Sequence, residues 1–216
     1  MNRRSLLLGS LSLVAVGAEA KKKKHRKPRE SARSLLSWVA SMQTHGFSDE
    51  GPSPEELVAM ISRGQHIEVS CGYVAAMGVL VMQQHGCEAR VVGCLTHDPW
   101  DGHNDGHIML ELREGQGWTL FDLDFNRALP QGVGIADACN GQRKWDVIAK
   151  DPLCTTWCEG GTTQKAVASG DAHLFGTAWI EDAAGWKVFH DDERRAFYEG
   201  KGFRWVDAEA WDALVH

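Results

Sequence analysis

Three residues whose types could together perform nucleophilic catalysis occur along the chain in the order Cys71, His107 and Asp122. In such a site a thiolate attacks a carbonyl carbon, an imidazole moves the proton, and a carboxylate orients the imidazole. This chemistry requires the three side chains to meet in the folded protein. The segments around them must therefore form elements that bring them to one point.

Cys71 begins an apolar segment that predicts a buried helix. Residues 73–82 are apolar except for Gly78, and a helix without a polar face is buried on most sides. Ser70 before the segment and Gly86 after it are typical of a helix N-cap and of the residue that follows a helix. Cys71 would lie in the first turn, where the helix dipole and free N–H groups favour a thiolate. The alternative is a buried cysteine with a structural role.

His107 and Asp122 fall on the two arms of a predicted β-hairpin. Apolar residues alternate along residues 108–112, and residues 118–124 have the composition of a second strand. The polar segment between them predicts the connecting loop.

The length of that loop decides which aspartate meets the histidine. A two-residue loop at Glu114–Gly115 would place His107 directly opposite Asp122, whereas a four-residue loop would place it opposite Asp124. We expect the shorter loop, and therefore a hydrogen bond between His107 and Asp122.

These segments resemble the transglutaminase-like cysteine enzymes, within the wider papain-like fold. The matching pieces are Cys71 leading an apolar helix, the strand Gly86-Cys-Glu-Ala-Arg-Val-Val-Gly93, and the hairpin with His107 and Trp118-Thr-Leu-Phe-Asp122. The resemblance implies that Cys71 is the nucleophile, His107 the base and Asp122 the orienting acid. It implies an α+β fold with the nucleophile at the N-terminus of a buried helix packed on an antiparallel sheet. One departure concerns the substrate groove, because Ile108-Met109 follow the histidine where the family usually has small or aromatic residues.

Gln65 is the candidate for the oxyanion hole. It lies six residues before Cys71, the spacing at which papain-like enzymes place a glutamine with that role. Its side-chain amide and the Cys71 backbone N–H could together hold a tetrahedral oxyanion. The alternative is a loop residue without a catalytic role.

The loop from His97 to His107 supports a different hypothesis, that of a metal-binding protein. It holds three histidines and three aspartates in eleven residues, and such side chains bind divalent metals. However, His97 and His103 lie in a segment rich in Gly, Pro and Asp, which is more typical of a turn at the rim of a site. We therefore expect no metal and no cofactor.

The N-terminal residues predict export from a bacterial cytoplasm. Residues 1–20 contain Arg3-Arg4, a short apolar run and the sequence Ala18-Glu19-Ala20, which together are typical of a cleaved signal peptide. The arginine pair resembles a twin-arginine signal. The sequence thus predicts a periplasmic or secreted protein without a stable membrane span.

Charge divides the rest of the chain into a basic arm and an acidic domain. Residues 21–30 hold seven basic residues and one acid, a composition that predicts a disordered arm able to touch anionic surfaces. Of 23 basic and 29 acidic residues in the chain, nine and two precede Ser31, which leaves 14 and 27 in residues 31–216. We expect these residues to form a single domain, and its acidic balance argues against nucleic acid as a partner.

The cysteines other than Cys71 leave the disulfide pattern open. An exported chain normally pairs its cysteines, but five remain, an odd number, so at least one of them is a free thiol. The sequence does not determine their pairing. They are Cys87, Cys94, Cys139, Cys154 and Cys158.

The function favoured by these features is that of an exported cysteine enzyme acting on peptide or amide carbonyls through a thioester intermediate. We expect hydrolysis rather than amine transfer, because water is the default acceptor. The expected substrate is a peptide or protein, including peptides of the cell envelope. Two alternatives stay open: a binding module on the same fold without activity, and the metal-binding protein described above.

The signal peptide makes a prediction about the mature chain. If cleavage follows Ala20, protein recovered from outside the cytoplasm should begin at Lys21. N-terminal sequencing or intact-mass measurement would check this. Recovery of exported protein that still begins at Met1 would contradict it.

Overall fold

The computed structural model describes residues 31–46, 51–96, 106–139, 146–147 and 175–215. The predicted signal peptide, the basic arm and most of the His97–His107 loop lie outside these residues. Among the described residues, no helix combines the length and the hydropathy that a bilayer crossing requires.

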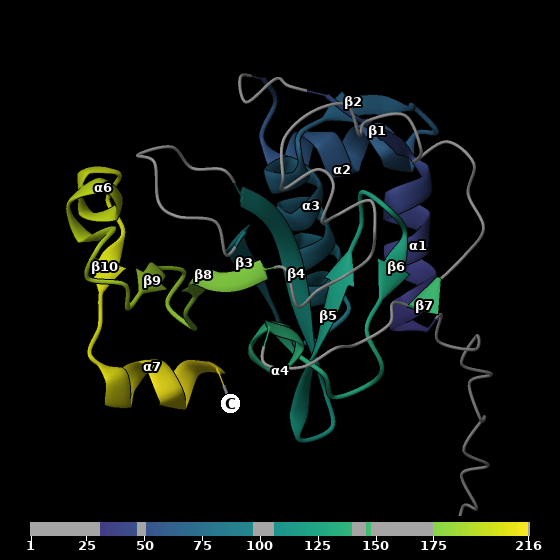
Figure 1. Ribbon diagram of the computed structural model, residues 1–216. Coiled ribbons are helices and arrows are strands. Elements are labelled where there is room, and N and C mark those ends of the chain that lie inside the picture. Colours follow the sequence, from purple (N-terminus) through teal and green to yellow (C-terminus); the bar gives the residue numbers. More distant parts are fainter. Residues whose placement is uncertain (1–30, 47–50, 97–105, 140–145, 148–174, 216) are drawn as a thin grey trace, which may run out of the picture.

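Three helices, α1, α2 and α3, form a layer on one side of the sheet, and the other helices are shorter and lie apart from this layer (Figure 1). Helix α3 packs against strand β4, and α1 and α2 pack against α3. The helices are α1 (Ala32–Ser41), α2 (Pro54–Ser62), α3 (Cys71–Gln84), α4 (Ile135–Cys139), α6 (Arg195–Gly200) and α7 (Ala208–Val215).

Most strands form one largely antiparallel sheet of eight, in the order β10-β9-β8-β3-β4-β5-β6-β7. A separate parallel pair, β1-β2, lies next to the start of α3 (Figure 1). The strands are β1 (Gln43–His45), β2 (Ile67–Val69), β3 (Ala89–Thr96), β4 (Gly106–Glu114), β5 (Gly117–Asp122), β6 (Arg127–Ala128), β7 (Asp146–Val147), β8 (Phe175–Glu181), β9 (Lys187–Phe189) and β10 (Arg204–Trp205).

The predicted buried helix is confirmed in α3. Its buried residues occur all around the helix, at Val74, Ala75, Met77, Gly78, Val79, Val81 and Met82. It ends where predicted, because Gly86 has a φ of 73°, a left-handed conformation that glycine adopts without a steric penalty.

The central strands are buried on both faces. Leu110 and Leu112 belong to the core cluster that includes the residues of α1, α2 and α3, whereas Met109 and Leu120 belong to a second cluster with Ile135 of α4. Successive residues of a strand point to opposite faces. The central part of the sheet is therefore a buried middle layer.

The predicted register of the hairpin is wrong. Leu110 pairs with Phe121 and Glu114 pairs with Gly117, which is the register of the longer-loop alternative, closed by a two-residue turn. Gly115 has a φ of 70°, and glycine at the first position of a two-residue loop suits a type II′ turn. Because the two registers differ by two residues, each side chain keeps its face in both, and hydrophobic alternation alone could not distinguish them.

A buried ion pair joins the neighbouring strands β3 and β4. Arg90 donates to Glu111 through Nε at 2.8 Å and also bonds the Leu214 carbonyl of α7. The other carboxylate oxygen of Glu111 accepts from the Ile135 backbone N–H at 2.7 Å. Burial raises the pKa of Glu111 despite the neighbouring Arg90. These contacts hold α4 and α7 against the sheet.

Strand β3 passes close to Trp179 of β8 at Gly93. A Cβ at Gly93 would overlap the indole of Trp179, and the pairing of β3 with β8 shifts register between Gly93 and Cys94. The glycine is therefore needed for the close approach of the two strands, rather than for an unusual φ.

We expect Gly93→Ala to destabilise the protein by about 1–3 kcal/mol, the usual cost of overpacking a core. The matched control is Gly200→Ala in α6, where a Cβ would have no neighbour within 4 Å and should be neutral or slightly stabilising. Urea unfolding of both variants would check this. Equal stability of Gly93→Ala and wild type would contradict the packing account.

Candidate active site

Cys71 is the first residue of α3 and is half-buried, with a free thiol. Ser70 is the N-cap in an extended conformation, but its side chain makes no capping hydrogen bond. The free amides at this end of the helix therefore contribute positive potential beside the sulfur.

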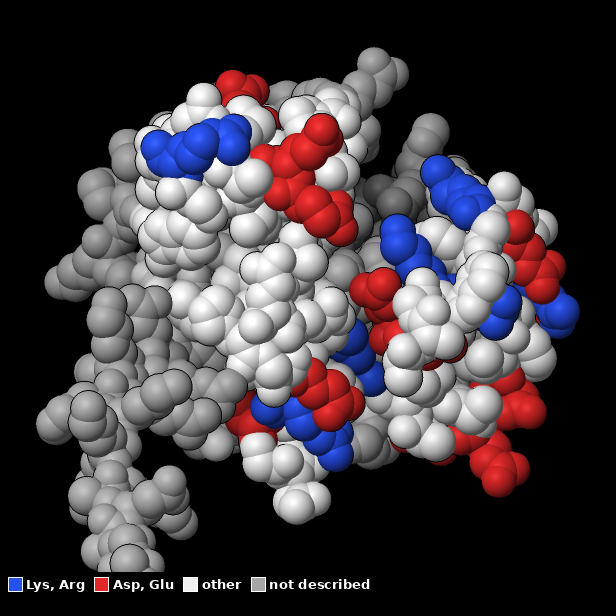
Figure 2. Space-filling model, turned by 180° about the vertical axis from the view of Figure 1, so that it is seen from behind, with Lys and Arg blue, Asp and Glu red and all other residues white. Residues whose placement is uncertain are grey.

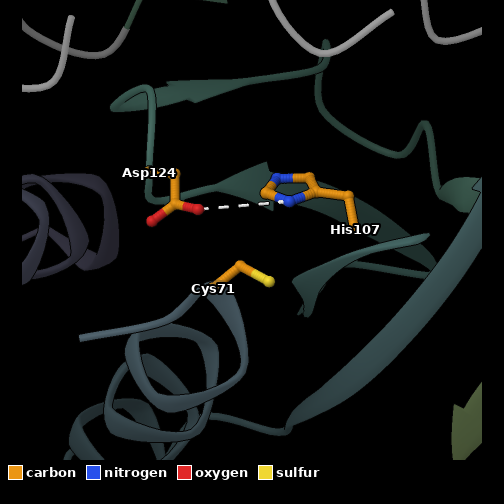
Figure 3. A group of neighbouring side chains, drawn as sticks. All are labelled: Cys71, His107 and Asp124. Atoms are coloured by element: carbon orange, nitrogen blue, oxygen red, sulfur yellow. Dashed lines mark ion pairs between the residues drawn. The ribbon is translucent and has the colours of Figure 1, made fainter. Parts of the chain in front are cut away.

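His107 comes from β4 and is 1% exposed. Its Nε2 lies 3.1 Å from Oδ1 of Asp122, and its Nδ1 lies 4.0 Å from Oδ2 of Asp124. Figure 3 shows the Nδ1 side of the ring turned towards the sulfur of Cys71. The structure thus brings Cys71, His107 and Asp122 together as the sequence predicted, although their catalytic roles remain predictions.

The hydrogen bond between His107 and Asp122 forms despite the changed register. Continuing the observed pairing places His107 opposite Asp124 and diagonal to Asp122. A shift of two residues keeps the same face of each strand, and diagonal neighbours are within reach of longer side chains. For this reason both aspartates approach the same imidazole.

Arg127 of β6 completes a buried group of charges. It pairs with Asp122 across the sheet and donates to Oδ2 of Asp122 from Nε at 3.0 Å and from Nη2 at 2.9 Å. Burial would raise the pKa of Asp122, but His107 and Arg127 outweigh it and hold this pKa at about 2. Burial likewise opposes the charged form of His107, yet Asp122 and Cys71 raise the pKa of His107 well above its usual value. The favoured charge state is therefore an imidazolium beside a carboxylate.

The sequence did not predict the contact between Asp124 and His45. Nδ1 of His45, at the end of β1, lies 3.0 Å from Oδ2 of Asp124. Asp124 is 3% exposed, and its Oδ1 is a buried atom with no hydrogen-bond partner among the described residues. His45 lies on a three-residue strand paired in parallel with β2, and no sequence periodicity marks so short a strand.

Among the described residues, no hydrogen bond or ion pair joins Gln65 to Cys71, His107 or Asp122. Its side chain is exposed, and its Oε1 accepts from Arg63 at 3.4 Å. Another carboxamide, that of Gln43 on β1, is 1% exposed and lies 3.5 Å from the carbonyl of Leu123 through Nε2. The role of Gln65 in an oxyanion hole stays a prediction.

The metal hypothesis based on His97 and His103 concerns residues outside the described ones. Within the described residues, a different group has ligand atoms within 4.8 Å of one another, namely Cys71, His107 and Asp124. It shares two residues with the predicted triad.

A cavity of 680 Å³ lies at the far end of β3 and β4 from His107. Its walls include Arg90, Arg113, Trp118 and Glu181, and none of the triad residues.

On the face seen in Figure 2, acidic and basic side chains are interspersed, so this face has no broad field of one sign.

Comparison with protein families matches residues 17–123 to the transglutaminase-like superfamily. No curated protein matches the chain. Among solved structures, the chain is similar to the crystal structure of a candidate cysteine protease from Cytophaga hutchinsonii, with 17% identity and a TM-score of 0.33 over 43% of this chain and 30% of that one. The match thus spans less than a third of that protein. The α+β fold, the helix that begins with Cys71 and the family match agree with the transglutaminase-like fold predicted from sequence.

The charge state of Asp122 makes a prediction about stability. Its pKa is about 2 in the folded protein, against about 3.9 in an unfolded chain. The carboxylate therefore contributes stability above about pH 4, of the order of 2 kcal/mol, and this contribution is lost as the pH falls towards 2. We expect Asp122→Asn to be less stable at neutral pH and to lose less stability than wild type between about pH 5.5 and pH 3.

Urea unfolding at the two pH values would measure this difference. Asp192→Asn is a matched control, because its side chain is exposed, and it should follow wild type. The account fails if Asp122→Asn loses as much stability on acidification as wild type does.

Proposed function

Since residues 17–123 match the transglutaminase-like superfamily, we propose that this protein is a cysteine enzyme that hydrolyses peptide or amide bonds through a thioester intermediate. The observation that carries the proposal is the convergence of Cys71 at a helix N-terminus, His107 beside it, and Asp122 on the other ring nitrogen.

In the first half of the reaction, the thiolate of Cys71 attacks the carbonyl carbon of the substrate. The carbonyl oxygen becomes an oxyanion, and in this proposal the Cys71 backbone N–H at the start of α3 binds it. The imidazolium of His107 gives its proton to the leaving nitrogen as the C–N bond breaks. The products of this half are a free amine and a thioester on Cys71.

In the second half, neutral His107 takes a proton from water, and the resulting hydroxide attacks the thioester carbon. The C–S bond breaks, the carboxylic acid leaves and the thiolate with its imidazolium is restored. Asp122, held by Arg127, keeps the ring oriented and its charged form favoured throughout. Water as acceptor is supported by the partial exposure of Cys71, and an amine in place of water would give transfer.

Export is a further part of the proposal. It is supported by the predicted signal peptide at residues 1–20 and the basic arm that follows. A protein outside the cytoplasm would meet extracellular or cell-envelope peptides, and we propose these as its substrate class.

The proposal predicts that Cys71 is much more nucleophilic than the other cysteines. An ordinary thiol is under about 1% thiolate at pH 6, whereas Cys71 lies at a helix N-terminus beside His107, two neighbours that favour negative charge on the sulfur. We expect iodoacetamide to label Cys71 at least about tenfold faster than Cys87, a half-buried free thiol in the same chain. Mass spectrometry of each cysteine peptide would give both rates.

Variants separate the triad from the fold. His107→Ala should slow labelling of Cys71 about tenfold or more at pH 6, while the matched variant His66→Ala, an exposed histidine, should leave it unchanged. Cys71→Ala should fold, as judged by circular dichroism, and should release no amine from peptide substrates. Labelling of Cys71 at the rate of Cys87 would refute the nucleophile.

A further inference from the structure

The mechanism above gives no role to the contact between His45 and Asp124. These side chains lie 3.0 Å apart, from β1 and from the segment after β5. Asp124 also approaches His107 Nδ1 at 4.0 Å on the side that faces Cys71 (Figure 3). The oxygen of Asp124 nearest to His107 is Oδ2, and His45 contacts this same atom.

The side chains around this point form a ready set of metal ligands. One ligand atom each from Cys71, His107 and Asp124 lies within 4.8 Å of the others. In a tetrahedral zinc site, with bonds of about 2.0–2.3 Å, neighbouring ligand atoms are about 3.3–3.7 Å apart. Small side-chain movements would therefore close the set around one ion.

The partners that hold these side chains in place are also of the kind found around metal ligands. Asp122 bonds the ring nitrogen of His107 that faces away from Cys71, at 3.1 Å, and His45 bonds the carboxylate of Asp124. Metal-binding histidines are commonly oriented by a carboxylate on the opposite nitrogen, and ligating carboxylates are themselves hydrogen-bonded. His45 contacts Oδ2, the oxygen of Asp124 that lies nearest to His107, and so fixes the position of that carboxylate.

We propose that Zn²⁺ binds to Cys71, His107 and Asp124 and reversibly inactivates the nucleophile. A thiolate and an imidazole favour zinc over Mg²⁺ or Ca²⁺, which prefer oxygen ligands. With the sulfur and the imidazole engaged by the ion, neither the attack nor the proton transfer can occur. The ion is therefore an inhibitor rather than a cofactor. As a regulator of the active site, it rests on the proposed function, whereas its binding can be measured without any substrate.

The test is the protection of Cys71 from labelling. Full-length protein, freed of metal with a chelator, is labelled with iodoacetamide at about pH 7 with zinc chloride, with magnesium chloride or with neither. We expect about one equivalent of zinc to slow labelling of Cys71 at least tenfold, and an excess of chelator to restore it. Magnesium should have no effect, and Cys87 should be labelled at the same rate in all three conditions.

Variants test the proposed ligands. Asp124→Asn should raise the zinc concentration for half-protection at least tenfold, and His45→Gln should raise it about tenfold, the usual cost of losing an orienting partner. His66→Gln is the matched control, because this exposed histidine contacts Thr44 rather than Asp124, and it should behave as wild type. If Asp124→Asn does not fold, His45→Gln decides the question alone.

The outcomes separate this inference from the proposed function. Rapid labelling of Cys71 without zinc, combined with no protection by zinc, would overturn the metal site and leave the nucleophile standing. Slow labelling without zinc, combined with protection by one equivalent, would overturn the nucleophile and leave the metal site standing. Half-protection at the same zinc concentration in Asp124→Asn, His45→Gln and wild type would overturn the role of Asp124.

Discussion

The buried charges of His107, Asp122 and Arg127 are the constraint on which the candidate site depends. Removing charges from water costs several kcal/mol for each ion unless they are paired with good geometry. Three neighbouring strands supply that geometry, since the residues come from β4, β5 and β6, with Asp122 and Arg127 directly paired across the sheet. Because β5 lies between β4 and β6, the negative Asp122 lies between the positive His107 and Arg127. Loss of the carboxylate would leave an imidazolium and a guanidinium buried side by side.

The helix layer places the sulfur where these charges can act on it. Because α3 has no polar face, it packs between the sheet and the helices α1 and α2. Because the side chains of α3 are buried in these contacts, the direction of the helix is fixed. Its N-terminus therefore lies at the edge of the core, with Cys71 close to His107. The site thus places the sulfur beside a positive helix end and an imidazole whose pKa is raised. Both aspartates approach His107, but their other partners differ: Asp122 also meets Arg127, and Asp124 also meets His45.

Local patterns predicted the elements of this site better than its register and its outer contacts. The apolar run after Cys71 and the glycine at 86 were sufficient for α3. The hairpin was predicted, but its register was wrong, because hydrophobic alternation does not distinguish registers two residues apart and Gly115 rather than Glu114 opens the turn. Asp122 nevertheless bonds His107, since a two-residue shift preserves the face of the strand. The contact between His45 and Asp124 joins residues far apart in the chain, through a pairing of short strands that leaves no local signal.

The central claim is that the folded protein holds His107 as an imidazolium beside Cys71. The most direct measurement is an NMR titration of the His107 ring in wild type and in Cys71→Ala. The account predicts that the pKa of His107 in wild type lies well above 6.5, because of Asp122 and Cys71, and falls when the sulfur is removed. A His107 that titrates near 6.5 in both proteins would contradict the account.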